Sequence, residues 1–427
     1  MTARTALLSA LCFAAAFLGL PAAALAKPVV AAYYFPAGEG VEALQRPSTA
    51  KLTHLVYAFV TLCGDNAAFD AEQKKARQAI CAGTADYGIT LPDTDATHAQ
   101  LAAIAELKLH NPDLKVIASV GGWGMPMFPD VVADPAHRQV FTESATAFLK
   151  RYPVFDGLDI DWEYPGGGDN ARALLSDAAR QSEAANHRAF IEGLRHALDA
   201  MKAGDGRDRL LTTAVAGYPR SVAGIDWKGV ADDFNLVFVM TYDFTPEKAF
   251  QRIGDYSGGG GWPGHHTNLV ATPLTDGYGA DAMIRNLEAA GVPQAKMVLG
   301  AGFYAREWTK ASFDAGRFPA SASAGTFVGA SSWWEVQARD LPAKGWTDGY
   351  DEAAQAAYLY DPKTGGFLSL DTPRSIAAKG AYARHEGLAG LFAWELSEDD
   401  GTLVDAMAAA ASGEGGKDVA PGVAPGN

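Results

Sequence analysis

Residues 155–165 of the chain read FDGLDIDWEYP, and this stretch carries more information than any other. Side chains of a β-strand alternate between its two faces, so Asp159, Asp161 and Glu163 project to one face and the apolar residues between them to the other. Pro165 cannot continue the strand, so Glu163 lies at the strand's C-terminal end. Three carboxylates on one face are costly to bury unless they share protons and hydrogen bonds.

Three interpretations of this row of carboxylates are open. A solvated strand edge is disfavoured, because the opposite face is wholly apolar. Carboxylate oxygens also suit calcium or magnesium, but an EF-hand loop needs a turn and a glycine that are absent here. The third interpretation is a relay in which one carboxyl group stays protonated and acts as a general acid. Neighbouring negative charges raise the pKa of the last carboxyl group, as a general acid at neutral pH requires.

Apolar runs of strand length recur along the chain and mostly alternate with helical patterns. Eight such runs are predicted, at residues 29–35, 54–62, 115–120, 157–162, 210–215, 236–240, 297–303 and 388–393. An α/β chain of this kind is expected to form a (β/α)8 TIM barrel, with the carboxylate face pointing into its interior. A doubly wound sheet shows the same alternation and stays open as an alternative. No glycine-rich phosphate turn follows the first strand, which disfavours its dinucleotide-binding version.

The chain is expected to have four parts. Residues 1–26 are predicted to be a signal peptide, residues 27–309 and 367–411 the catalytic barrel, residues 310–366 an inserted subdomain and residues 412–427 a flexible tail rich in glycine, proline and alanine. The insertion lies between the seventh and eighth strands. Its six tryptophan and tyrosine residues are too many for a simple helical crossover, so a small α+β unit is predicted.

The N-terminal residues predict export. Arg4 precedes an apolar run at residues 6–20 and the sequence Ala24-Leu25-Ala26, which together are the parts of a secretory signal peptide. The run is shorter than the ~20 apolar residues that a membrane span needs. We therefore expect cleavage after Ala26 and a secreted protein, extracellular or periplasmic. Cys63 and Cys81 would remain and are expected to form one disulfide that closes a surface loop, with two free thiols as the alternative.

The charge balance disfavours whole classes of partner. The 427 residues carry a formal net charge of −15, and 48% of them are hydrophobic, enough for a large core. Nucleic acids and anionic membranes both attract basic patches, so neither is an expected partner, and no membrane association is expected after signal cleavage. The expected partner is neutral or cationic.

The acidic stretch resembles the signature D-G-x-D-x-D-x-E of glycoside hydrolase family 18, the chitinases and their relatives. Four further segments resemble motifs of that family in the same order: SVGGW at residues 119–123, MTYD at 240–243, FYAR at 303–306 followed by Trp308, and LFAWE at 391–395. The resemblance runs from about Val29 to Leu403 and includes the inserted subdomain of the chitinase branch.

The resemblance implies a retaining mechanism in which the substrate's own acetamido group is the nucleophile, through an oxazolinium intermediate. Glu163 would protonate the glycosidic oxygen as general acid. Asp161 would turn toward the acetamido N–H and stabilise the positive charge that develops there, and Asp159 would share a proton with Asp161. Tyr242 would donate a hydrogen bond to the acetamido oxygen and direct it at the anomeric carbon.

The resemblance also implies a set of sugar-binding residues. Asp243 and Arg306 would bind sugar hydroxyl groups, and Trp394 would form an apolar floor under the distorted sugar. Further candidate substrate-binding residues are Met240, Trp123, Tyr33, Phe59 and Trp308. No metal and no cofactor are expected. His265 and His266 are adjacent in sequence, cannot readily chelate one metal, and are expected to brace their loop.

The predicted function is that of a secreted, monomeric chitinase that hydrolyses β-1,4 bonds between N-acetylglucosamine units of chitin or chito-oligosaccharides. An endo-β-N-acetylglucosaminidase that acts on N-linked glycans would use the same catalytic row and is an alternative. A chitin-binding lectin without activity is a second alternative, but such proteins typically lack the terminal acid, which is present here as Glu163. The sequence leaves attack at a chain end or within a chain open.

Overall fold

The computed structural model describes residues 27–36, 40–167, 175–244, 263–314, 316–320 and 322–414. The expected signal peptide lies outside the described residues, as does the expected tail from residue 415 onward. Ser412 belongs to helix α12 (Thr402–Ser412), which corrects the expected tail boundary. The helix ends at Gly413, whose φ of 82° is a left-handed conformation that glycine adopts without steric cost.

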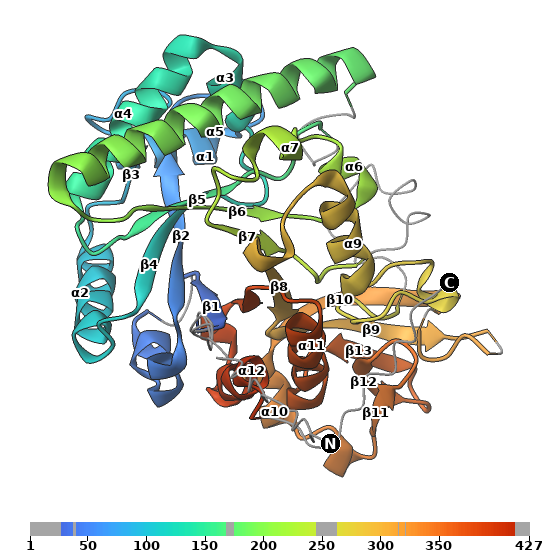
Figure 1. Cartoon of the computed structure of the whole chain (residues 1–427). Coiled ribbons are helices and arrows are strands. Elements are labelled where there is room, and N and C mark those ends of the chain that lie inside the picture. Colours follow the sequence, from blue (N-terminus) through green and yellow to red (C-terminus); the bar gives the residue numbers. More distant parts are fainter. Residues whose placement is uncertain are drawn as a thin grey trace, which may run out of the picture.

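Eight parallel strands of the described chain close into a barrel (Figure 1). They are β1 (Val29–Tyr34), β2 (His54–Leu62), β4 (Lys115–Gly121), β5 (Gly157–Asp161), β6 (Leu210–Val215), β7 (Leu236–Val239), β8 (Met297–Gly302) and β14 (Gly390–Trp394). Neighbours pair in the order β1-β14-β8-β7-β6-β5-β4-β2, and β1 also pairs with β2, with Ala31 opposite His54. This closing pair confirms the predicted barrel and excludes a doubly wound sheet, because an open sheet would leave unpaired edges.

Helices cover the outside of the barrel (Figure 1). The longer ones are α2 (Asp95–His110), α4 (Pro135–Arg151), α5 (Asp177–Asp205), α9 (Ala280–Ala290), α11 (Pro373–His385) and α12; shorter ones are α3 (Phe128–Ala133), α6 (Pro219–Val222) and α7 (Trp227–Val230). Along α5 the buried apolar residues recur at helical spacing, at Phe190, Ile191, Leu194 and Leu198, so one face of the helix packs inward. That face lies against α3 and α4.

The alternation of side chains along each barrel strand produces two apolar layers. Leu158 and Ile160 point outward and pack in the large core between strands and helices. Tyr33, Phe238 and Phe392 point inward and fill the barrel interior. The inward face of β5 is the exception to this apolar filling, because it carries the carboxylates of the acidic stretch.

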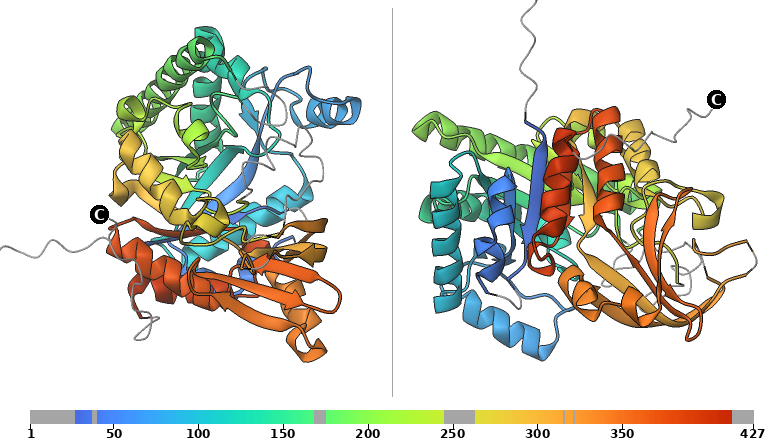
Figure 2. Two further views of the ribbon diagram at one scale, coloured as in Figure 1. Left: turned by 90° about the vertical axis from the view of Figure 1, so that its right-hand side faces the viewer. Right: turned by 90° about the horizontal axis from the view of Figure 1, so that it is seen from below.

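A second sheet lies beside the barrel as a separate layer (Figure 2). Its five antiparallel strands are β9 (Tyr304–Ser312), β10 (Ala324–Ser332), β11 (Thr347–Asp351), β12 (Ala356–Asp361) and β13 (Gly366–Leu370), with α10 (Trp333–Arg339) after β10. The pairing order is β10-β9-β13-β12-β11. The sheet is inserted between β8 and β14, and its strands extend beyond the expected limits of 310 and 366 on both sides.

A disulfide joins Cys63 to Cys81 across 18 residues. Cys63 follows β2, and Cys81 follows α1 (Ala71–Ile80), so the bond ties this helix to the end of a barrel strand. The short strand β3 (Ile89–Thr90) then pairs antiparallel with β2. The bond confirms the disulfide expected from the sequence. Within the described ranges, no helix combines the length and the apolar character needed to traverse a membrane.

Candidate active site

Strand β5 places the acidic row inside the barrel. Asp159 is fully buried and accepts three hydroxyl hydrogen bonds: Tyr33 Oη lies 3.0 Å and Ser119 Oγ 2.8 Å from its Oδ2, and Thr212 Oγ1 lies 2.7 Å from its Oδ1. Asp161, one pleat further along, is 3% exposed. Glu163 lies just beyond the C-terminal end of the strand and is only partly buried. The row therefore runs from the closed interior toward solvent.

The two aspartates differ in how their negative charge is stabilised. Burial raises the pKa of Asp159, but its three hydroxyl donors oppose this shift. Burial also raises the pKa of Asp161 well above its usual value, and the charges of Glu163 and Asp159 raise it further. Among the described residues, Asp161 Oδ1 has no hydrogen-bond partner. A proton shared within this row is therefore held more strongly at Asp161 than at Asp159.

Two glycines at the end of β4 allow the chain to approach Asp161 closely. The N–H of Gly122 donates to the carbonyl oxygen of Asp161 at 2.8 Å. A Cβ on Gly121 would lie 1.9 Å from that same oxygen, and one on Gly122 would lie 2.6 Å from the ring of Phe59. A larger residue at position 121 would displace β4 from β5 at the level of the acidic row, and one at position 122 would displace the ring of Phe59.

A cavity of about 380 Å³ opens at the C-terminal ends of the barrel strands. Its walls are Tyr33, Phe35, Phe59, Trp123, Asp161, Glu163, Tyr164, Ala214, Ala216, Tyr218, Arg220, Met240, Tyr242, Asp243 and Trp394. All but three of the catalytic and sugar-binding residues expected from the sequence are among them. Asp159 is one exception, because it lies beneath the cavity and reaches it only through its neighbours in the row.

Aromatic rings form one side of the cavity. Trp394, the last residue of β14, stacks on Phe59 with a ring-centroid distance of 5.9 Å and an interplanar angle of 26°. Its ring also lies 5.6 Å from that of Tyr33 and 5.9 Å from that of Phe35. The ring of Trp123 lies 6.4 Å from that of Tyr164, and Trp123 is 44% exposed. A flat apolar surface of this kind suits the C–H face of a pyranose ring.

Tyr242 and Asp243 follow β7 and form the wall next to the acidic row. Burial raises the pKa of Tyr242 well above its usual value, as do the nearby charges of Asp161 and Glu163, so its hydroxyl group keeps its proton and can donate a hydrogen bond. Asp243 has a φ of 57°. Its Oδ1 lies 3.0 Å from Arg306 Nη1. Arg306 lies on β9 and does not line the cavity, so it acts on the site through Asp243.

The third exception is Trp308, which the structure does not bring to the cavity. It is 3% exposed and packs in the core of the second sheet, with its ring 5.7 Å from Phe327 and 6.1 Å from Phe367. This corrects the expectation that Trp308 binds sugar. The motif that contains it continues into β9, and the alternation of that strand turns Trp308 toward Phe367 of the neighbouring β13.

Four larger cavity residues were not predicted from the sequence: Phe35, Tyr164, Tyr218 and Arg220. Each lies at or just beyond the C-terminal end of a predicted barrel strand, where barrel enzymes build their sites. That position was a usable signal for all four. The described part of the chain contains no cluster of three His, Cys, Asp or Glu side chains arranged to hold a metal ion.

A (β/α)8 barrel whose buried carboxylates lead into an aromatic-lined cavity is an arrangement that glycoside hydrolases use. The chain belongs to the glycosyl hydrolases family 18, which it matches over residues 29–399.

Two proteins named as chitinases are similar in sequence to this chain. The chain is 31% identical over 417 residues to Chitinase A of Pseudoalteromonas piscicida, covering 83% of this chain and 48% of that protein. It is 33% identical over 386 residues to Chitinase A1 of Niallia circulans, covering 82% of this chain and 53% of that one. The chain thus spans about half the length of these two relatives.

A solved structure extends the comparison to the whole fold. The family 18 N-acetylglucosaminidase of Paenibacillus barengoltzii superimposes with a TM-score of 0.71 at 29% identity, covering 90% of this chain and 99% of that one. The fold of this chain therefore matches that of a solved family member over nearly the full length of both chains.

Proposed function

We propose that this chain is a chitinase that hydrolyses β-1,4 bonds between N-acetylglucosamine units by a retaining, substrate-assisted mechanism. The observation that carries the proposal is the acidic row of β5, which places Glu163 in the cavity directly after the buried Asp161. The names of the relatives in both sequence comparisons support chitin as the substrate.

Glu163 is the proposed general acid. It lies at the open end of the row and lines the cavity, where it can reach a glycosidic oxygen. After the leaving group departs, the same carboxylate accepts a proton from the water that opens the oxazolinium intermediate. The nucleophile is the carbonyl oxygen of the substrate's acetamido group, so no second protein carboxylate has to attack the sugar.

Asp161 and Asp159 are the proposed relay behind the acid. In the resting enzyme Asp161 holds the proton, since its carboxylate lacks the hydroxyl donors that stabilise Asp159. When the acetamido N–H enters the site, Asp161 turns to accept its hydrogen bond and passes the proton to Asp159. The negative charge on Asp161 then lies beside the positive charge that develops on the acetamido group.

Tyr242, Asp243 and Trp394 are proposed to hold the sugar. Tyr242 donates its hydroxyl hydrogen to the acetamido oxygen and holds that oxygen at the anomeric carbon, which is catalysis by orientation. Asp243, fixed by Arg306, accepts hydrogen bonds from sugar hydroxyl groups. Trp394 supports the apolar face of the ring, and Tyr33, Phe59, Met240 and Trp123 complete the walls.

Release of single sugars is a second candidate function, favoured by the name of the solved relative, an N-acetylglucosaminidase. A chitohexaose digest separates the two. A chitinase that cuts within the chain yields dimers to tetramers first, whereas an N-acetylglucosaminidase yields monomer from the first time point.

Hydrolysis itself is tested with a fluorophore-labelled chito-oligosaccharide, compared with removal of N-linked glycans from a glycoprotein. We expect fluorophore release by the wild type, with the β-anomeric product first, and release slowed by roughly 10²- to 10⁴-fold in Glu163→Gln. Activity on the glycoprotein alone would establish the endo-β-N-acetylglucosaminidase instead. Binding of the oligosaccharide by a wild type without turnover would establish the lectin.

Export of a monomeric protein is part of the proposal. The Cys63–Cys81 disulfide supports an oxidising compartment outside the cytoplasm, because disulfides are rare where thioredoxin and glutathione keep thiols reduced. The proposed domain division assigns the second sheet to the inserted α+β subdomain and the remaining elements to the catalytic barrel.

A further inference from the structure

A second cluster of buried charges lies outside the acidic row. Lys379 on α11 and Asp371, which follows β13, are both fully buried, and Lys379 Nζ lies 2.7 Å from Asp371 Oδ2. Neither residue lines the catalytic cavity. A buried ion pair contributes little net stability compared with an apolar pair of the same size. The groups that this pair holds in place therefore matter more than its own contribution to stability.

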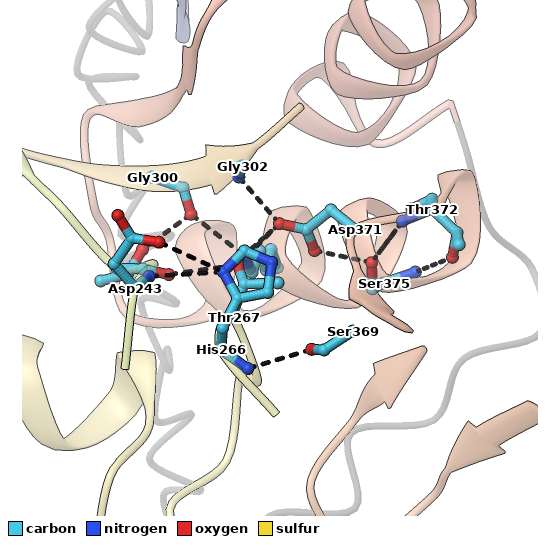
Figure 3. Close-up of polar contacts among 11 residues, drawn as sticks. Asp243, His266, Thr267, Gly300, Gly302, Ser369, Asp371, Thr372 and Ser375 are labelled. Atoms are coloured by element: carbon cyan, nitrogen blue, oxygen red, sulfur yellow. Dashed lines mark hydrogen bonds and ion pairs between the residues drawn. The ribbon is translucent and has the colours of Figure 1, made fainter. Parts of the chain in front are cut away.

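The pair is held by hydrogen bonds from several elements (Figure 3). Lys379 Nζ also donates to Thr267 Oγ1 at 2.7 Å and to the carbonyl oxygen of Gly300 at 3.1 Å. The N–H of Gly302 donates to Asp371 Oδ2 at 3.0 Å, and Ser375 Oγ donates to Oδ1 at 2.7 Å. The pair therefore joins the second sheet and α11 to the C-terminal end of β8.

The same atoms hold Thr241, the residue before Tyr242. Thr241 Oγ1 donates to the carbonyl oxygen of Gly300 at 2.7 Å, which is the carbonyl that Lys379 also binds. Thr267 Oγ1, which Lys379 also binds, lies 2.8 Å from Asp371 Oδ2 and 3.2 Å from the carbonyl oxygen of Thr241, so these two oxygens share its one hydroxyl hydrogen. The hydroxyl and carbonyl groups of Thr241 thus contact atoms that Lys379 also binds, while its N–H donates to the carbonyl oxygen of Val239 at 2.8 Å. Tyr242 is the next residue.

The loop next to Thr267 also reaches Asp243 (Figure 3). His266 Nδ1 lies 3.4 Å from the backbone nitrogen of Asp243, which donates to it, and the N–H of Phe244 donates to the carbonyl oxygen of His266 at 3.0 Å. The N–H of His266 in turn donates to Ser369 Oγ on β13 at 3.0 Å. Segment 266–267 therefore runs beside segment 241–244 and connects it to the second sheet.

We infer that Lys379 and Asp371 are positioning residues that set the place of Tyr242, acting through Thr267 and Thr241. This inference rests on the proposed role of Tyr242. A hydroxyl group that orients a nucleophile must be placed accurately, and a displacement of about 1 Å costs about 100-fold in rate. The second sheet, by holding Asp371, thus takes part in aligning the reacting group from outside the cavity.

Thr267 offers the gentlest test, because valine matches threonine in shape and lacks only the hydroxyl group. We expect Thr267→Val to lower kcat on a labelled chito-oligosaccharide by about 10- to 100-fold with KM within about threefold, because orientation is lost in the transition state. Thr267→Ser restores the hydroxyl group and should recover most of the lost kcat.

A double-mutant cycle separates positioning from a general loss of structure. If the network acts through Tyr242, then Thr267→Val should cost less than about threefold in kcat when Tyr242→Phe is already present. The double variant Lys379→Met with Asp371→Asn removes both charges together and leaves neither unpaired. Its loss of kcat should likewise be smaller when Tyr242→Phe is already present. The control is Phe190→Leu, which loosens the ring pair with Phe141 in the helical layer, at a centroid distance of 4.9 Å.

The outcomes distinguish the inference from the proposed function. If Thr267→Val lowers kcat equally in the wild-type and Tyr242→Phe backgrounds, the inference is overturned. It is also overturned if Phe190→Leu, at the same fall in Tm, lowers kcat as much as Thr267→Val does. A wild type that turns over no chito-oligosaccharide would overturn the proposed function and the inference together.

Discussion

Tyr33 on β1 donates a hydrogen bond to Asp159 on β5 across the barrel interior, with 3.0 Å between Tyr33 Oη and Asp159 Oδ2. The same tyrosine ring lies 5.6 Å from that of Trp394. One residue thus connects the base of the acidic row to the aromatic wall of the cavity. Together with Ser119 and Thr212, it donates to the carboxylate of Asp159 and opposes the rise in pKa that burial causes there.

Asp161→Asn is expected to stabilise the protein as pH rises. The pKa of Asp161 is raised in the folded state, chiefly by burial, so its contribution to stability is fully present below the pKa of the unfolded chain and is lost as pH rises toward the folded pKa. Asparagine carries no such cost. Thermal unfolding of both proteins should give similar Tm values near pH ~3 and a higher Tm for Asp161→Asn at neutral pH. A lower Tm for the variant at neutral pH would contradict the charge assignment.

Glu163→Gln should lower kcat by roughly 10²- to 10⁴-fold, the usual contribution of a general acid. Glutamine has the same shape, and the residue lies at the cavity rather than in the core, so Tm and oligosaccharide binding should change little. Initial rates and isothermal titration on the same chitotetraose check both points. Near-normal turnover would remove Glu163 from its proposed role.

Trp394→Ala should weaken oligosaccharide binding about tenfold, which corresponds to about 1.4 kcal/mol. The loss is that of the apolar contact between one ring face and the sugar, at roughly 25 cal/mol per Å² of buried surface. The affinity of Glu163→Gln for chitotetraose, measured with and without the Trp394 substitution, gives this number without interference from turnover.

Trp334 is the matched control for Trp394. It is 38% exposed on α10 and does not line the cavity, so Trp334→Ala should leave chitotetraose affinity unchanged. Equal effects of the two substitutions would mean that the aromatic wall is not the sugar-binding surface.

Removal of the disulfide, by Cys63→Ser with Cys81→Ser, should lower the free energy of unfolding by about 2–4 kcal/mol, because the bond restricts a loop in the unfolded chain. Denaturant unfolding with and without a reducing agent measures the effect. The double serine variant should not respond to the reducing agent. If the wild type unfolds identically in both conditions, the bond does not stabilise the fold.

The barrel strands were predictable from runs of apolar, β-branched and aromatic residues of strand length. The predicted limits of the second and fifth of the predicted barrel runs, residues 54–62 and 210–215, coincide with β2 and β6. The limits of the insertion were less well predicted, because β9 continues directly from the end of β8 without a polar break. The chain leaves the barrel for the second sheet at this point because different strands pair with β8 and β9. Local sequence patterns do not predict which strands will pair.

The sequence by itself determined the alternation that lines three acidic side chains along one face of β5, because this alternation is a local property of an extended chain. Only the tertiary structure decided which groups meet that row and that cavity. Tyr33 and Asp159 are 126 residues apart, and Thr267 and Lys379 are 112 residues apart. Barrel closure and the docking of α11 bring these pairs together, and the same packing exposes Trp123 while burying Trp308.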